Sequence, residues 1–227
     1  MKRRAVVLLS GGLDSATTLY LAKKRGYRCD CLTFDYGQRH RREIGSAKKI
    51  ARMAGARCRV VPLSFSWKGS SLLDRRVKIP AGLGRRRGRR PGIPSTYVPA
   101  RNIVFLSLAL SHAESIGASA VFIGANAVDF SGYPDCRGEF YRAFRKAASL
   151  GTKAGVEGRG VKILTPLIHK TKAEIVRMAL ALGVPLRHTW SCYRGARRPC
   201  GRCDSCSFRA KGFREAGLKD PLIYGES

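Results

Sequence analysis

Apolar and polar positions follow one another along the chain in blocks of two kinds. Residues 5–9 form a short apolar run with the length of a buried strand, and the run stops at residues 10–12, Ser-Gly-Gly. Apolar residues return at helical spacing from Leu13 onward, and basic residues 23–25 precede a stop at Gly26. The pattern predicts a buried strand, a tight two-glycine turn and a helix.

The same alternation continues to residue 183. Further strands are predicted at 29–36, 59–63, 120–124 and 161–164, and further helices at 41–55, 102–117, 138–150 and 171–183. Thr171 and Glu174 have the spacing of a capping box at the start of the last helix. This order predicts an α/β, Rossmann-like fold, with a mainly parallel sheet, helices on both faces and a ligand site at the carboxyl ends of the strands.

One long segment breaks the pattern. Residues 64–98 are irregular, and residues 84–92 are rich in arginine and glycine and too polar to pack in a core. Such a segment is either a mobile lid or a solvated insertion.

Size and composition indicate one compact domain with a small appendage. The chain has 227 residues, of which 44% are apolar. Its basic start followed by residues 5–9 imitates a signal peptide, but the apolar stretch is too short, and no run reaches the length of a membrane span. We therefore expect a soluble, cytoplasmic protein that does not associate with membranes.

The formal net charge is +29. A basic surface attracts polyanions, so weak and non-specific association with RNA is one interpretation. The other is an arginine-rich composition with solvated basic helix faces. The charge is spread over the whole chain and forms no single stripe. This distribution favours the second interpretation and leaves the first open.

The turn at residues 10–12 has the features of an anion site. Glycines let a backbone approach a phosphate, and the free N–H groups and dipole of a helix N-terminus face its charge. Ser10 and Ser15 add hydroxyl donors, and Asp14 can orient a metal ion or the loop. An ordinary serine–glycine turn is the alternative. The segment SGGLDS differs from GxxxxGK[ST] and GxGxxG loops and resembles the pyrophosphatase loop of ATP-dependent adenylating enzymes.

Four cysteines near the C-terminus have metal-ligand spacing. They are Cys192, Cys200, Cys203 and Cys206. Four thiolates at short spacings suit a tetrahedral, structural Zn²⁺ with no open position. Two disulfides or a redox CxxC pair are the alternatives, which a cytoplasmic location and the fourth cysteine disfavour. Cys29, Cys31 and Cys58 are expected to be small buried residues.

With the SGGLDS loop and the four cysteines located, the chain resembles the 7-cyano-7-deazaguanine synthases, which make the nitrile precursor of queuosine and archaeosine in tRNA. The matching segments run nearly end to end: SGGLDS, FDYGQRH (34–40), STYVPARN (95–102), GANAVDFSGYPDCR (124–137), TPLIHKTKAEIV (165–176) and SCY…CGRCDSC (191–206). SGYPDCR is the most distinctive of them. Ala100 stands where glycine is expected in many relatives, and residues 84–92 lie outside the motifs.

The resemblance implies a ligase of the adenine nucleotide alpha hydrolase-like fold. The carboxylate of 7-carboxy-7-deazaguanine would attack the α-phosphate of ATP, ammonia would displace AMP to give an amide, and a second ATP would activate the amide for conversion to the nitrile. Mg²⁺ is expected to bridge phosphates, and one structural Zn²⁺ per chain is expected. Free ammonia is the expected nitrogen donor because no glutaminase-like motif is evident. We also expect a homodimer, which the sequence itself does not establish.

Site residues follow from the motifs. ATP is expected to contact Leu8, Leu9, Ser10, Gly11, Gly12, Leu13, Asp14, Ser15, Ala16, Thr17 and Thr18. Ser10, Asp14, Ser15 and Lys172 are the expected catalytic residues, with Lys170 as a further basic candidate. Arg101, Asn126, Asp129, Tyr133 and Asp135 are expected to bind the deazaguanine substrate. A nucleophilic role for Cys136 is not favoured, because adenylation already activates the acid.

We expect an ATP-binding domain at residues 1–186 and a C-terminal cysteine-rich, helical segment at 187–227. Two other classes of protein stay open. A pyrophosphatase-loop enzyme acting directly on tRNA would explain the charge, but it would lack SGYPDCR and would usually need a separate RNA-binding domain. A zinc-ribbon nucleic-acid-binding module would explain the cysteines and leave SGGLDS without a role.

Overall fold

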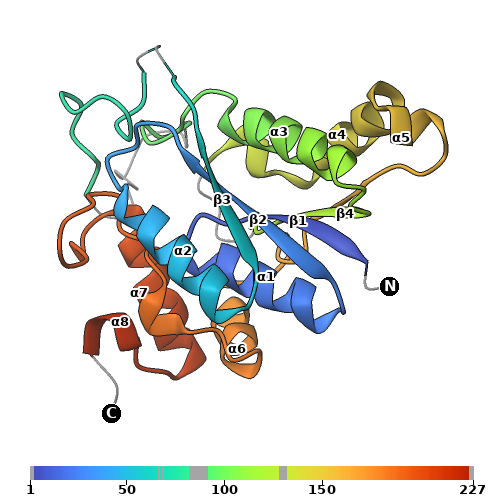
Figure 1. The fold of residues 1–227 in the computed structure, drawn as a ribbon. Helices are drawn as coiled ribbons and strands as arrows, with labels where there is room; N and C mark the ends of the chain where they lie inside the picture. Colours follow the sequence, from blue (N-terminus) through green and yellow to red (C-terminus); the bar gives the residue numbers. More distant parts are fainter. Residues whose placement is uncertain (1–2, 66, 68, 82–91, 128–131, 225–227) are drawn as a thin grey trace.

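The computed structural model describes residues 3–65, 67, 69–81, 92–127 and 132–224. Its centre is a parallel sheet of five strands in the order β3-β2-β1-β4-β5 (Figure 1). The strands are β1 (Arg4–Leu8), β2 (Arg28–Asp35), β3 (Arg57–Pro62), β4 (Ala120–Ile123) and β5 (Lys162–Leu164). The predicted parallel α/β fold is confirmed.

Helices connect the strands and extend the chain beyond β5. They are α1 (Leu13–Lys24), α2 (Arg42–Met53), α3 (Arg101–Ser115), α4 (Gly138–Gly151), α5 (Lys153–Val156), α6 (Lys172–Ala181), α7 (Asp204–Ala216) and α8 (Pro221–Tyr224), with 3₁₀ turns η1 (Pro134–Cys136) and η2 (Leu186–His188). Every strand and helix predicted from the pattern is present. The capping box at the start of α6 is also confirmed, since Thr171 and Glu174 exchange hydrogen bonds with each other's backbone N–H groups.

The central strands β1, β2 and β4 are buried on both faces. Ala5 and Val7 point to a core that includes residues of α1, α2, α6 and α7, whereas Val6 and Leu8 point to a second core with α3 and α4. Figure 1 shows these two sets of helices on opposite faces of the sheet. Because both faces are covered, β1 after Arg4 and β4 are continuous apolar runs.

The strand order determines where a ligand can bind. The chain leaves β1 toward β2 on one side, and β4 pairs with β1 on the other. The connections therefore diverge at the carboxyl ends of β1 and β4, which is where open parallel sheets leave a crevice.

The segment after α6 packs back on the sheet domain. Phe213 of α7 belongs to the same core as α1 and α6. Arg209 of α7 forms a buried, two-pronged ion pair with Asp220, at 2.6 and 2.8 Å, and donates to Thr189 Oγ1 at 2.7 Å. The predicted domain boundary at residue 186 falls within η2 and stays a prediction.

No helix in the described ranges is long and apolar enough to cross a membrane. Of the arginine- and glycine-rich stretch 84–92, only Gly92 belongs to the described residues.

Candidate active site

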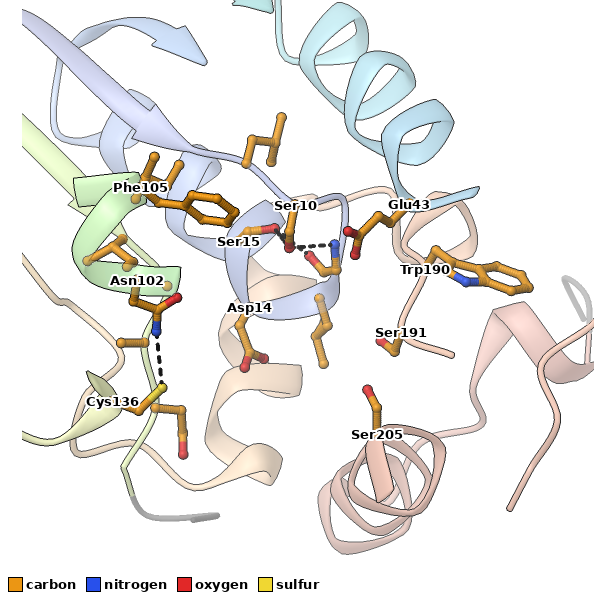
Figure 2. Close-up of a pocket in the computed structure, with 18 of the residues that line it drawn as sticks. Ser10, Asp14, Ser15, Glu43, Asn102, Phe105, Cys136, Trp190, Ser191 and Ser205 are labelled. Atoms are coloured by element: carbon orange, nitrogen blue, oxygen red, sulfur yellow. Dashed lines mark hydrogen bonds between the residues drawn. The ribbon is translucent and has the colours of Figure 1, made fainter. Parts of the chain in front are cut away.

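A cavity of about 310 Å³ opens at the carboxyl ends of the strands. The β1–α1 loop forms its floor, the ends of β2 and β4 and the start of α3 form one wall, and α6, α7 and the chain near Trp190 form the other (Figure 2). The size is within the range of small-molecule sites.

The β1–α1 loop has the geometry of an anion site. Ser10 Oγ lies 3.1 Å from Ser15 Oγ, and the Gly12 N–H points to Ser10 Oγ at 3.4 Å. Gly12 is the N-cap of α1, and no side chain among the described residues caps the helix there. The first N–H groups of α1 are therefore left for an acceptor in the cavity.

Two glycines allow the loop to fit between its neighbours. Gly11 has a φ of +82°, and a Cβ there would lie 2.3 Å from the carbonyl oxygen of Glu43 in α2. A Cβ on Gly124, just after β4, would lie 2.9 Å from the backbone of Asp14. The start of α1 is thus held between α2 and the end of β4, with no room for a side chain at either contact.

Lys172 and Asp14 form the charged centre of the cavity. Lys172 Nζ lies 2.7 and 2.9 Å from the two carboxylate oxygens of Asp14. The side chains are 13% and 26% exposed. Gly212 of α7 packs on Lys172, where a Cβ would meet the lysine Cγ at 2.3 Å. The first turn of α6 and the surface of α7 together direct the Lys172 ammonium group toward Asp14 and the β1–α1 loop, which we call the phosphate loop after the family motif it carries.

Aromatic side chains form the far end of the cavity. Phe34 and Phe105 stack with ring centroids 4.0 Å apart, and Tyr36 meets Phe105 edge-on at 5.4 Å. Burial raises the pKa of Tyr36 to about 12, so its hydroxyl is neutral at physiological pH. Tyr133 is buried and donates to Thr96 Oγ1 at 2.7 Å. Such an end suits flat ring systems.

Arg101 belongs to this aromatic end. Its guanidinium lies 5.9 Å from the ring centroid of Tyr133 and 6.0 Å from that of Phe105, and it donates to the Tyr36 hydroxyl at 3.5 Å. Within the described ranges, no carboxylate forms a salt bridge with it. Arg101 follows Ala100, the one described non-glycine residue with positive φ (+54°), which explains why glycine is favoured at that position.

The residues predicted to bind the deazaguanine separate into three groups. Asn126, Tyr133 and Arg101 line the cavity, although the Asn126 side chain also donates to the Lys170 carbonyl. Asp135 lies behind the wall, and its Oδ2 accepts the Asn102 N–H at the start of α3 at 3.0 Å. Asp129 lies outside the described residues.

The Asp135 carboxyl is almost fully buried. Burial raises its pKa, and its Oδ1 has no hydrogen-bond partner in the described part of the chain. Cys136 lines the cavity, and its Sγ accepts from the Asn102 side chain at 3.4 Å.

Several lining residues were missed from the sequence. They are His40 before α2, Glu43 within α2, Trp190, Ser191 and Tyr193 after η2, and Ser205, Phe208 and Arg209 of α7. His40 is the last residue of the FDYGQRH motif, and Glu43 follows it by three residues. The motif supported the family resemblance, but the sequence assigned no role to its residues. The α7 residues follow the cysteines, and only the packing of α7 on α6 brings them to the cavity.

The four C-terminal cysteines form a cluster. The Sγ atoms of Cys192, Cys200, Cys203 and Cys206 all lie within 4.8 Å of one another, and all four thiols are free. The Cys203 N–H points to Cys200 Sγ at 3.4 Å, and the Cys200 N–H to Cys192 Sγ at 3.4 Å. Backbone donors aimed at the sulfurs suit thiolates, so the cluster can hold a metal ion. Elsewhere, Cys29 and Cys31 are buried as predicted, whereas Cys58 is half-buried.

Comparison with known proteins identifies the family. A family model described as "Queuosine biosynthesis protein QueC" matches residues 4–217. The chain belongs to the QueC family. A 7-cyano-7-deazaguanine synthase from Anaeromyxobacter sp. (strain Fw109-5) is 54% identical over 225 residues, covering 98% of this chain and 96% of the relative. One from Acetivibrio thermocellus is 52% identical over 224 residues, covering 99% of each chain.

Solved structures share the fold of this QueC family member. A 4-thiouridine synthetase–RNA complex with bound ATP has a TM-score of 0.53 at 21% identity, covering 95% of this chain and 50% of that one. NMN synthetase from Francisella tularensis has a TM-score of 0.50 at 14% identity, covering 100% and 78%. The predicted adenine nucleotide alpha hydrolase-like fold, the family and the ligase-type enzyme class are confirmed.

Proposed function

We propose that this QueC family member converts 7-carboxy-7-deazaguanine to 7-cyano-7-deazaguanine with ATP and ammonia. The observation that carries the proposal is one cavity that joins an anion-binding loop to an aromatic end with an arginine. If a nucleoside triphosphate and a flat acid were both held in that cavity, their reacting groups would meet at its centre, beside Lys172.

The phosphate end binds the pyrophosphate portion of ATP. Ser10, Ser15 and the N–H groups at the start of α1 donate to its oxygens. Lys172, held by Asp14, neutralises the charge that develops on the leaving pyrophosphate. Preorganised donors of this kind are usually the largest contribution to such a reaction.

The aromatic end binds and orients the acid. Arg101, which has no carboxylate partner in the described part of the chain, pairs with the substrate carboxylate and directs it to the α-phosphate. Tyr133 and Phe105 contact the flat ring, and Asn126 provides polar groups. Fixing both reactants in line replaces an encounter in solution by an intramolecular step.

The reaction then has four steps. The carboxylate displaces pyrophosphate to give an acyl-adenylate, and ammonia displaces AMP to give the amide. A second ATP adenylates the amide oxygen, and loss of AMP leaves the nitrile. The same loop serves both activation steps, because pyrophosphate leaves in each.

Two metal ions are part of the proposal. The four cysteines fit one Zn²⁺ per chain, since four thiolates complete a tetrahedral shell and leave no position for water. Mg²⁺ fits as a companion of ATP, because both Asp14 oxygens already bind Lys172 and the described residues that line the cavity form no cage of carboxylates. The homodimer, the cytoplasmic location and weak RNA association stay predictions.

The test uses the purified protein with ATP, ammonium and the acid, without tRNA. We expect the nitrile and AMP by mass spectrometry, with amide accumulating when ATP is limiting and added amide being converted. Without ammonium, we expect acid-dependent exchange of labelled pyrophosphate into ATP. Asp14→Ala and Ser15→Ala should each reduce nitrile formation by roughly 10²–10³-fold, while the folded structure is retained.

Three outcomes would contradict the proposal: no acid-dependent exchange, a strict requirement for tRNA, or near-wild-type turnover in both variants. Absence of the amide at every ATP level, with added amide left unconverted, would refute the two-activation scheme.

A further inference from the structure

The charged groups that line the cavity fall into two kinds. Lys172 is paired with Asp14, and Arg209 is paired with Asp220. In the described part of the chain, Arg101 forms no salt bridge with a carboxylate, and Glu43 pairs with the His40 imidazole but with no lysine or arginine. Among the described residues, the cavity therefore offers one cation without a carboxylate partner and one carboxylate that faces a histidine but no lysine or arginine.

The proposed reaction requires both. Its acid and ATP are anions and suit the loop and Arg101, whereas its nitrogen source in neutral water is mainly the ammonium cation. We infer that Glu43 binds ammonium and takes its proton, delivering ammonia to the acyl-adenylate. The inference rests on the proposed function and adds a residue to it.

Glu43 is placed for this role by the turn into α2. Its backbone N–H donates to the His40 carbonyl at 3.0 Å, and its own carbonyl packs on Gly11. Figure 2 shows the carboxylate pointing from the start of α2 toward the loop that carries Ser10. The side chain is 14% exposed, so the carboxylate is largely withdrawn from solvent and still lines the cavity.

Two polar side chains fix the Glu43 carboxylate. Gln38 Nε2 donates to Oε1 at 3.1 Å, and His40 Nε2 lies 3.3 Å from the same oxygen. Gln38 is itself held, since it donates to the Phe34 carbonyl and accepts the Tyr36 N–H. Both contacts are to Oε1, so among the described residues Oε2 is the oxygen left for a ligand. Gln38 and His40 are positioning residues in this arrangement.

The step balances as follows. Glu43 removes one proton from ammonium, and the electron pair of that N–H bond becomes the lone pair of ammonia. Ammonia forms the C–N bond to the acyl carbon, and the C–O bond to AMP breaks with its electron pair on the departing phosphate. The surplus proton on nitrogen passes to a phosphate oxygen of AMP. The products are the amide, AMP and a protonated Glu43, which returns its proton to solvent.

The test separates adenylation from amidation. Glu43→Gln keeps the size of the side chain and an oxygen to accept from Gln38. We expect it to retain acid-dependent pyrophosphate exchange, which needs no ammonium. Amide formation should fall by about 10²–10⁴-fold, the usual effect of a general base, with a raised KM for ammonium. Hydroxylamine is largely uncharged at neutral pH and should rescue the variant by forming the hydroxamate.

Glu139→Gln is the matched control, because Glu139 is an exposed carboxylate of α4 that does not line the cavity. It should leave both reactions unchanged. Loss of exchange together with amidation in Glu43→Gln would overturn the inference, since Glu43 would then serve ATP or the fold. An unchanged KM for ammonium with unchanged amidation would also overturn it. In either case the wild-type exchange reaction still tests the proposed function separately.

Discussion

At the scale of the residue, the contact of Lys172 with Asp14 distinguishes this lysine from its neighbour Lys170. Lys172 is the first residue of α6, and its Nζ reaches Asp14 across the cavity. Lys170, two residues earlier, pairs instead with Glu174 at 2.8 Å and does not line the cavity. The two neighbouring lysines thus make different contacts despite similar places in the sequence.

Lys172→Met should therefore abolish most turnover, and Lys170→Met should not. Removing the Lys172 charge leaves Asp14 facing the phosphates without compensation, and we expect a loss of roughly 10²–10³-fold in kcat. Lys170→Met should stay within a few-fold of wild type. Steady-state nitrile formation measures both, with circular dichroism to confirm folding. Equal losses in the two variants would show that Lys172 acts only as general surface charge.

At the scale of the element, the end of β4 touches the start of α1. Gly124 follows β4 directly and packs on the backbone of Asp14. The contact sets the distance between the strand that leads to Asn126 and the helix that carries the phosphate loop. A side chain at this position would have to move one of them.

Gly124→Ala should consequently lower activity more than stability. A Cβ at 2.9 Å from Asp14 backbone atoms displaces the first turn of α1 by a few tenths of an ångström or more. We expect a KM for ATP raised by about 10-fold or more, equivalent to about 1.4 kcal/mol of binding. Gly138→Ala, whose Cβ meets only the Arg142 side chain at 3.7 Å, is the control. A normal KM for ATP in Gly124→Ala would show that α1 adjusts without consequence.

The elements themselves were accessible from the sequence because their apolar faces have clear periods. The predicted strands and helices occur in the predicted order, and the capping box of α6 is as predicted. The short helix α5 was not predicted. Element ends also differ: β3 begins at Arg57, two residues before the predicted start, because its first positions lie on an exposed edge. The site was harder. SGYPDCR suggested that Asp135 binds substrate, yet its Oδ2 accepts from Asn102, a contact between segments 33 residues apart that no local pattern encodes.

At the scale of the whole molecule, the cavity depends on the C-terminal cysteine cluster. Trp190 and Tyr193 line the cavity, and both pack on the cluster, with Trp190 donating to the Cys192 carbonyl at 3.0 Å. Arg209, also a lining residue, ties α7 to Asp220 and Thr189. The wall that faces the phosphate loop is therefore organised by residues that follow α6.

Removal of the metal should accordingly lower activity because the wall of the cavity loses its folded structure. A closed site of four thiolates contributes folding free energy, because it does not exist in the unfolded chain. A chelator, or Cys203→Ser, should release one zinc per chain, lower the melting temperature by at least about 5 °C and reduce nitrile formation in parallel. Cys58→Ser removes a half-buried thiol far along the chain from the cluster and should change neither metal content nor activity.

The order of these losses distinguishes a structural metal from a catalytic one. If zinc took part in the chemistry, chelation would stop turnover while the melting temperature stayed unchanged, and added zinc would restore activity at once. A structural zinc requires the segment that carries Trp190 and Arg209 to refold, so activity should return no faster than the fluorescence of that tryptophan. Freshly purified, active protein with far less than one zinc per chain would contradict the assignment of this metal altogether.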